Sequence, residues 1–227
     1  MRNVQGVLGC SGRNYAGQRK NLKWAAFRRG RITATNFGPV LKNASTSRAP
    51  SQSLMKTLLG GYDLSGVHAV QWGQMHEDIA IALYEKENMV EVEKMGIWLS
   101  TSGKLGASPD GFIRTDTIIE VKCPYSARST TLADLASKKY FLTAKEDGFE
   151  LNLQDVTGHK YFHQVRGNLH LTGRSKCIFI VWTPSEMKTF VVEKDPDWSS
   201  SLQLLEKFYD EKFFPAFLLS SAEKQPF

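Results

Sequence analysis

Apolar residues along this chain recur at two spacings, one typical of helices and one typical of strands. Between Trp72 and Tyr84 the spacing is helical, which predicts a long helix over Val67–Asn88. Further helices are expected over Asn21–Arg29, from about Thr35 to Lys42, and over Leu54–Leu59, Leu132–Lys138, Gly158–Thr172 and Ser199–Phe214. Runs rich in β-branched residues predict strands over Met89–Leu99, Thr117–Cys123, Lys176–Thr183 and Met187–Lys194.

The order of these elements favours an α/β fold with a mixed central β-sheet flanked by α-helices. We find no internal repeat and no second-domain linker, so residues 21–227 are predicted to form one domain. Residues 1–20 are basic and lack periodicity, which predicts a flexible N-terminal arm. Asp197 is the expected cap of the last helix, and the apolar tail Phe213–Leu219 either closes the core or meets another subunit.

The stretch Gly106–Pro124 predicts two short antiparallel strands joined by a turn at Arg114-Thr115-Asp116. Side chains alternate along a strand, so Glu120 and Lys122 share one face. Folding back at the turn brings Asp110 towards Glu120, and Gly111 permits a close approach there.

Two carboxylates beside a lysine are costly to bury unless a cation lies between them. Oxygen ligands of this kind suit Mg²⁺, with Mn²⁺ as a substitute. A divalent ion with a neighbouring ammonium group can catalyse phosphodiester hydrolysis. The alternative for this hairpin is an ordinary solvated one with Glu and Lys two residues apart.

The bulk composition is that of a globular protein with a basic balance. Formal net charge is +6, with a pI near 9.2, which fits a polyanionic partner such as nucleic acid. No apolar run is long enough for a membrane span or a signal segment, so we expect an intracellular, non-secreted protein in a bacterial or host cytoplasm, or in a eukaryotic nucleus. Cys10, Cys123 and Cys177 form no C-x-x-C pair and are expected to be reduced thiols.

Asp110 followed by Glu120-Val121-Lys122 resembles the signature of the PD-(D/E)XK nucleases. The wider pattern is similar to the branch that contains lambda exonuclease and the YqaJ-like viral recombinases, over about Trp24 to Trp182. The resemblance implies a restriction-endonuclease-like core. It also implies one or two Mg²⁺ ions held by Asp110, Glu120 and the Val121 carbonyl, with Lys122 positioning or activating the attacking water.

Two helical motifs extend this resemblance. Trp72-Gly73-x-x-x-Glu77 is similar to the helix of the family that adds an acidic residue to the metal site, which implies that role for Glu77. Tyr161-x-x-Gln164-Val165 resembles a motif whose glutamine lies at the active site, which implies a catalytic role for Gln164. From the residues alone, Glu77 would be a solvated side chain and Gln164 a packing one.

The segment Arg28-x-x-Arg31-Ile32-Thr33-Ala34-Thr35 is followed by a predicted helix start, with Thr33 or Thr35 as its N-cap. Free N–H groups, hydroxyls and arginines at a helix start suit a phosphate, although a capped helix with exposed arginines is the alternative. The family uses a similar segment to hold a 5′-terminal phosphate, which implies this role for Arg28 and Thr35, with Arg31 and Thr33 beside them.

Taken together, the resemblance implies a metal-dependent exonuclease that digests linear double-stranded DNA from 5′ to 3′ in recombination, repair, or viral or phage DNA processing. A structure-specific endonuclease on the same fold and a non-catalytic nucleic-acid-binding protein are the alternatives. The implied partners are double-stranded DNA and a single-strand annealing protein. Relatives form trimers or monomers, and the sequence leaves both open.

Overall fold

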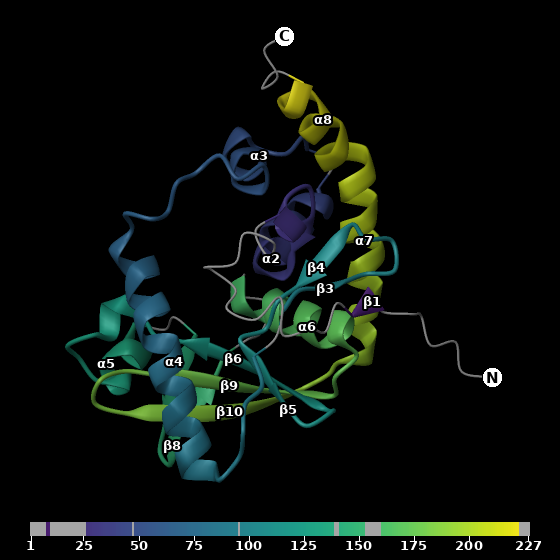
Figure 1. Ribbon diagram of the computed structural model, residues 1–227. Coiled ribbons are helices and arrows are strands. Elements are labelled where there is room, and N and C mark those ends of the chain that lie inside the picture. Colours follow the sequence, from purple (N-terminus) through teal and green to yellow (C-terminus); the bar gives the residue numbers. More distant parts are fainter. Residues whose placement is uncertain are drawn as a thin grey trace.

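The computed structural model describes residues 8–9, 26–46, 48–94, 96–138, 141–152 and 160–222 of the 227-residue chain. The longer helices in this part of the chain are α2 (Phe37–Ala44), α3 (Gln52–Leu58), α4 (His68–Asn88), α5 (Leu132–Ser137), α6 (Lys160–Thr172), α7 (Ser200–Phe208) and α8 (Phe214–Ala222). They surround two four-stranded sheets and a small hairpin (Figure 1). The prediction of an α/β fold with mixed sheets flanked by helices is confirmed.

The larger sheet carries the predicted Gly106–Pro124 hairpin. Its strands follow the order β10 (Met187–Glu193), β9 (Lys176–Trp182), β6 (Thr117–Lys122) and β5 (Gly111–Ile113). Strands β6 and β9 run parallel, whereas the β5–β6 and β9–β10 pairs are antiparallel. The sheet is therefore mixed, and the predicted hairpin and C-terminal strand pair are both confirmed.

Strand β6 is buried on both faces because a helix covers each side of it (Figure 1). Ile119 and Val121 pack with Ala80 and Ile81 of α4, while Ile118 packs with residues of α6 and α5. Since neighbouring side chains point to opposite faces, Glu120 and Lys122 lie on the side of Ile118 and α6. This alternation directs both polar side chains towards one helix.

The smaller sheet lies nearer the N-terminus of the described chain. Its order is β1 (Leu8–Gly9), β3 (Trp98–Leu99), β4 (Leu105–Ala107) and β2 (Ile32–Thr33). A second core joins it to α2 and α7, where Phe37 stacks on Trp198 at 6.2 Å between ring centroids. Apart from β1, the predicted arm over residues 1–20 lies outside the described residues.

Two connections between the predicted elements differ from the structure. Met89 adopts a left-handed conformation (φ 53°) that ends α4, so the predicted strand over Met89–Leu99 is reduced to β3 and a single bridge at Glu93. The segment between the predicted helices Leu132–Lys138 and Gly158–Thr172, for which we expect a loop, forms a hairpin of β7 (Leu142–Lys145) and β8 (Gly148–Leu151). Asp147-Gly148 at its turn is a sequence signal for such a hairpin.

The predicted helix ends are partly wrong. Of Asn21–Arg29, residues 26–29 are described, and 26–28 are helical. A 3₁₀ helix, η2 (Ala34–Asn36), precedes α2, and Thr33 occupies its N-cap without capping it through the side chain. Asp195, rather than Asp197, caps the short 3₁₀ helix η5 (Pro196–Ser199) before α7.

The C-terminal helix is longer than predicted. It passes from α7 through a π-helical turn, η6 (Tyr209–Phe213), into α8, and Pro215 lies in the first turn of α8. Phe213 is buried in the second core, whereas Leu219 is exposed. One face of this tail therefore packs on the second core, and the other face is exposed. Within the described residues, every helix is too short or too polar to cross a membrane.

Candidate active site

The β5–β6 hairpin places Asp110 beside Glu120. The Asp110 amide donates to the carbonyl of Ile119 at 3.0 Å, and its carboxylate Oδ2 accepts from the Val121 amide at 2.7 Å. A Cβ on Gly111 would overlap the side chain of Val92, which explains the glycine that follows Asp110. Asp110 is 9% exposed and Glu120 is 1% exposed, so the two carboxylates form a largely buried pair.

Polar side chains from α6 surround the Glu120 carboxylate. Gln164 Nε2 donates to Glu120 Oε1 at 2.6 Å, and Asn168 Nδ2 donates to Oε2 at 2.9 Å. The Lys122 ammonium group forms an ion pair with Oε1. Gln164 and Asn168 are one helical turn apart and so lie on one face of α6. Both oxygens of Glu120 are therefore held in fixed positions.

Burial changes the acidity of this carboxyl group. Desolvation raises the pKa of Glu120 to about 7, and the negative charges of Asp110 and Glu77 raise it as well, against the opposing effect of Lys122. Burial is therefore the main reason for the raised pKa of Glu120, and the neighbouring negative charges add to it. A cation placed between these carboxylates would lower their repulsion.

Lys122 lies under the ring of Tyr161, with Nζ 4.7 Å from the ring centroid. Burial by itself would lower the pKa of Lys122, but the charges of Glu120 and Asp110 outweigh burial and raise the pKa above its usual value. Lys122 is therefore an ammonium ion at neutral pH. It can orient a water molecule or offset negative charge, and it does not act as a neutral base in this state.

Glu77 reaches the same region from α4. Helix α4 packs on β6, and after burial the charge of Glu77 contributes to the raised pKa of both Glu120 and Cys123. Burial, the largest cause, raises the pKa of Cys123 to about 12, so this thiol stays protonated. The neighbouring His76 instead stacks on Trp182, at 5.0 Å between centroids, and bonds to the Trp72 carbonyl.

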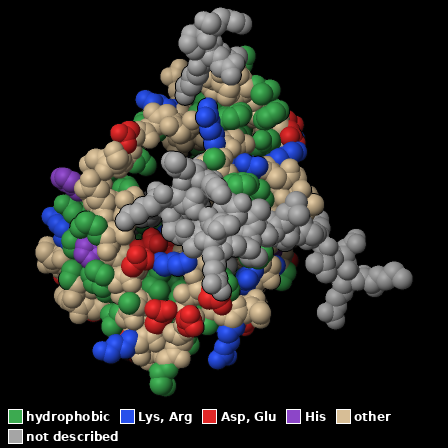
Figure 2. Space-filling model, in the orientation of Figure 1, with side chains coloured by type: hydrophobic (Ala, Val, Ile, Leu, Met, Phe, Trp, Pro, Cys, Tyr) green, Lys and Arg blue, Asp and Glu red, His purple; other side chains and the backbone are tan. Residues whose placement is uncertain are grey.

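The residues present fit a Mg²⁺ ion that retains part of its water shell. No group of three His, Cys, Asp or Glu side chains with metal-binding geometry occurs within the described ranges. Mg²⁺ usually binds through one or two carboxylates and completes its shell with waters and substrate phosphates, and Asp110 and Glu120 supply that number. Asn168 Oδ1 is buried and has no hydrogen-bond partner among the described residues, so it offers a further acceptor for an ordered water. Figure 2 shows acidic and basic side chains side by side next to a hollow on one face.

A second polar site lies around the turn that precedes β2. Arg28 Nη2 donates to the Thr33 hydroxyl at 3.0 Å, and both residues line a cavity of about 480 Å³. The walls also include Arg29, Gly30, Arg31, Asn36, residues 57–60, Phe217, Ser220 and Ser221. Three arginines around one cavity suit an anionic group.

The four predicted phosphate-binding residues occupy different positions around this cavity. Arg31 Nε donates to the Gly103 carbonyl and Nη1 to the Phe27 carbonyl, both at 2.8 Å. With these two bonds Arg31 stabilises the turn that precedes β2, as a brace between Phe27 and Gly103. Thr33 is buried and bonded to Arg28, whereas Thr35 is exposed and is not among the lining residues. The structure thus brings Arg28, Arg31 and Thr33 together around the cavity.

Two residues of the site were given no role there by the sequence prediction. Asn168 holds Glu120, and Tyr161 covers Lys122. Both lie on the face of α6 that carries Gln164, at intervals of three and four residues. The helical spacing was therefore a signal that could have found them.

Comparison with known proteins gives a consistent result. The profile of the YqaJ-like viral recombinase domain matches residues 23–175. Among solved structures, the alkaline exonuclease LHK-Exo from Laribacter hongkongensis is 23% identical with a TM-score of 0.64, and the match covers 88% of this chain and 96% of that one. The same enzyme in complex with dAMP is 25% identical, with a TM-score of 0.59 and coverage of 88% and 93%. No curated protein matches the chain.

A phage-related exonuclease from Haemophilus somnus 129PT shares the fold at 14% identity, with a TM-score of 0.54 and coverage of 85% and 96%. The fold is thus that of the alkaline exonucleases, built around the Asp110–Lys122 hairpin. The chain belongs to the YqaJ-like viral recombinase domain family.

Proposed function

We propose that this chain is a metal-dependent exonuclease that digests linear double-stranded DNA from 5′ to 3′ and recognises a 5′ phosphate. Family membership and the alkaline exonuclease fold support the broader statement that it is a nuclease acting on DNA. The observation that carries the proposal is the buried cluster of Asp110, Glu120 and Lys122, held by Gln164 and Asn168. Recombination, repair, or viral or phage DNA processing is the setting that fits the family.

Each residue of the cluster has a separate task in this proposal. Asp110 and Glu120 hold one or two Mg²⁺ ions, with the Val121 carbonyl and Glu77 as further oxygen donors. When bound, such an ion polarises a phosphoryl oxygen and lowers the pKa of a bound water. Lys122 contributes a fixed positive charge for the developing negative charge of the phosphate. Gln164 is the neutral donor that keeps Glu120 in place.

The arginine-lined cavity provides the end selectivity. Arg28 and Thr33, with Arg31 as a brace, present donors to a terminal phosphate, and Thr35 lies on the adjoining surface. Charge-assisted hydrogen bonds from a guanidinium group suit a phosphate dianion better than a hydroxyl group. A 5′-phosphorylated end should therefore be preferred over a 5′-hydroxyl end.

The deciding experiment compares three substrates: linear duplex DNA with a 5′ phosphate, the same duplex with a 5′ hydroxyl, and a closed circle. Each is incubated with Mg²⁺ and with EDTA. We expect Mg²⁺-dependent loss of the phosphorylated linear duplex and an intact circle. Cutting of the circle would identify an endonuclease on the same metal site, and binding without cleavage in Mg²⁺ or Mn²⁺ would refute the proposal.

A further inference from the structure

The C-terminal helix lies beyond the residues that the family profile matches, yet it contacts the arginine-lined cavity. The profile ends at residue 175, whereas α7, the π-helical turn and α8 span residues 200–222. We call this continuous segment the C-terminal rod. Figure 1 shows it along one side of the molecule, next to α2 and the smaller sheet.

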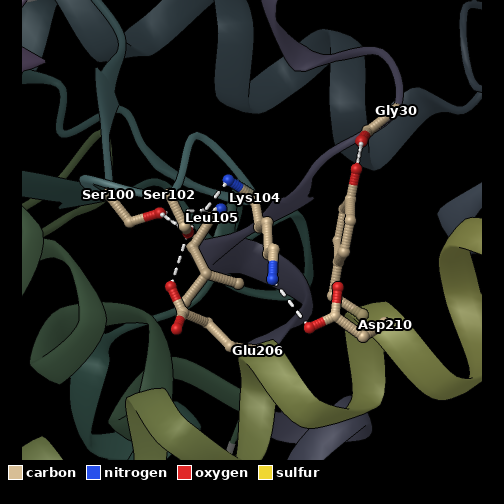
Figure 3. A network of polar contacts seen from close by, with 8 residues as sticks. Gly30, Ser100, Ser102, Lys104, Leu105, Glu206 and Asp210 are labelled. Carbon is tan, nitrogen blue, oxygen red and sulfur yellow. Dashed lines mark hydrogen bonds and ion pairs between the residues drawn. The ribbon is translucent and has the colours of Figure 1, made fainter.

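The rod is tied to the turn between β3 and β4. The Ser102 hydroxyl donates to Glu206 at 2.5 Å, and the Lys104 ammonium group pairs with Asp210 at 2.7 Å (Figure 3). The hydrogen bond to Asp210 raises the pKa of Lys104. Both contacts are partly exposed, so each contributes modestly, but together they fix the position of the rod along this turn.

The same turn also holds the arginine segment. The Gly103 carbonyl accepts from Arg31 Nε at 2.8 Å, and the Lys104 carbonyl accepts from the Ile32 amide at 3.1 Å. Residues 102–104 therefore connect the rod to the backbone of the cavity. A shift of the rod would reach Arg31 through this turn.

A direct contact joins the rod to Gly30, in the middle of the arginine segment. The Tyr209 hydroxyl donates to the Gly30 carbonyl at 2.9 Å (Figure 3). Gly30 has a positive φ of 73°, and a Cβ built there would lie 3.1 Å from the ring of Phe217. The backbone between Arg28 and Arg31 is thus held from one side by a hydrogen bond and from another by an aromatic ring.

The rod also forms part of the cavity wall. Phe217, Ser220 and Ser221 line it together with the arginines, and the Ser220 hydroxyl donates to the Phe217 carbonyl at 2.9 Å. The serines lie near the C-terminal end of α8, where the helix dipole disfavours an anion. Their contribution to binding is therefore smaller than that of the arginines, and the main effect of the rod is on geometry.

We infer that the C-terminal rod is a positioning element of the 5′-phosphate site, with Tyr209 and Phe217 as its positioning residues. This inference rests on the proposed function, because it concerns the end selectivity of that activity. By fixing Gly30, the rod sets the direction in which Arg28 presents its guanidinium group to the terminal phosphate. End selectivity should then depend on residues about 180 positions from Arg28.

The test uses Tyr209→Phe in the full chain, which removes one hydroxyl and keeps the ring. The measured quantity is kcat/KM on the 5′-phosphorylated duplex divided by kcat/KM on the 5′-hydroxyl duplex. Loss of one hydrogen bond should lower this ratio about fivefold, with the value for the hydroxyl duplex unchanged. Tyr84→Phe, which removes a phenol hydroxyl from α4, is the matched control and should keep the wild-type ratio.

A second measurement needs neither metal nor cleavage. Calorimetry measures the binding of a 5′-phosphorylated trinucleotide in EDTA. This binding should weaken in Tyr209→Phe by a similar factor, while the 5′-hydroxyl trinucleotide binds both proteins equally.

If the wild type prefers the phosphate and Tyr209→Phe keeps that preference, only the role of the rod is refuted. If the wild type digests DNA without any preference, the phosphate site itself is refuted. Equal losses on both duplexes would show a general effect on folding and overturn the inference.

Discussion

The Asp110–Lys122 hairpin and the Arg28–Thr33 turn are two polar sites within the described residues, and they are stabilised differently. The hairpin is buried, and its geometry follows from strand pairs and a side-chain bond between residues at most eleven positions apart. The arginine turn is partly exposed, and its geometry depends on contacts with Gly103 and Tyr209. The first site is therefore formed by its own sheet with α6 and α4, whereas the second also needs the C-terminal rod.

This difference assigns cleavage to the hairpin and the choice between DNA ends to the arginine turn. Changes to the hairpin should abolish cleavage on every substrate, because all of them use the same carboxylates. Changes to the arginine turn should alter the choice between DNA ends and leave cleavage itself in place. The following predictions test that separation.

The largest effect is expected for Asp110→Asn. The amide is similar in shape and can still accept from the Val121 amide, but it no longer supplies a carboxylate charge to a metal ion. Cleavage of both linear duplexes should fall by about a thousandfold or more, with normal folding by circular dichroism. Asp116→Asn, in the exposed turn of the same hairpin, is the control and should retain activity. Substantial cleavage by Asp110→Asn would contradict the assignment of the site.

Glu120 should make the metal-free protein less stable as the pH rises. Its pKa is about 7 in the folded state, against an ordinary 4.5, so between these values the unfolded chain loses a proton that the folded chain keeps. The free energy of unfolding should therefore fall as the pH rises from 4.5 towards 7, by up to about 1.4 kcal/mol per pH unit. Urea denaturation in EDTA measures this change, and Glu120→Gln should remove most of it. An unchanged slope in that variant would assign the pH dependence to other groups.

Arg28→Ala should change end selectivity by about tenfold to a hundredfold. A charge-assisted hydrogen bond contributes about 1.5–3 kcal/mol, and only the phosphorylated duplex receives it. Arg28→Lys should recover part of the loss, because lysine keeps the charge but not the planar pair of donors. Digestion of the 5′-hydroxyl duplex is the internal control. A parallel fall on both ends would show that Arg28 acts on folding or on general DNA binding.

The smallest effects should distinguish the two threonines. Thr33 accepts a hydrogen bond from Arg28 inside the cavity, whereas Thr35 is exposed outside its lining. Thr33→Val should lower the preference for a 5′ phosphate about fivefold, and Thr35→Val should lower it less. Competition between the two duplexes in one reaction measures such small ratios. A larger effect at Thr35 would mean that bound DNA brings that hydroxyl to the phosphate.

The sequence predicted the hairpin well because its determinants are local. The turn at Arg114-Thr115-Asp116, the alternation along β6 and the helical stripe of α6 all lie within short windows. The β7–β8 hairpin was missed although Asp147-Gly148 marks its turn. The strand predicted after α4 failed because Met89 ends the helix in a left-handed conformation, which its side chain does not reveal.

The arginine turn was predicted only through its motif. The bond between Thr33 and Arg28, in place of a helix cap, depends on the path of the backbone through Gly30. That path is held by residues far from Gly30 in the sequence, including Tyr209 and Phe217. Contacts between residues so far apart in the sequence form only when the chain packs. A single sequence has no periodic pattern that would predict them.

The π-helical turn Tyr209–Phe213 is a point where the C-terminal rod can gain or lose one residue without losing its alignment. A π turn holds one residue more than an α-helical turn, and each residue rotates a helix by about 100°. Deleting one residue here would leave a regular α-helical turn of nearly the same rotation, so the face of α8 that carries Phe217 would still point to Gly30. Deleting one residue between this turn and Phe217 would instead rotate that face by about 100° and move Phe217 away from Gly30. Among homologues that share the 5′-phosphate preference, chain length is therefore expected to differ by one residue at the π turn and to stay constant between this turn and Phe217.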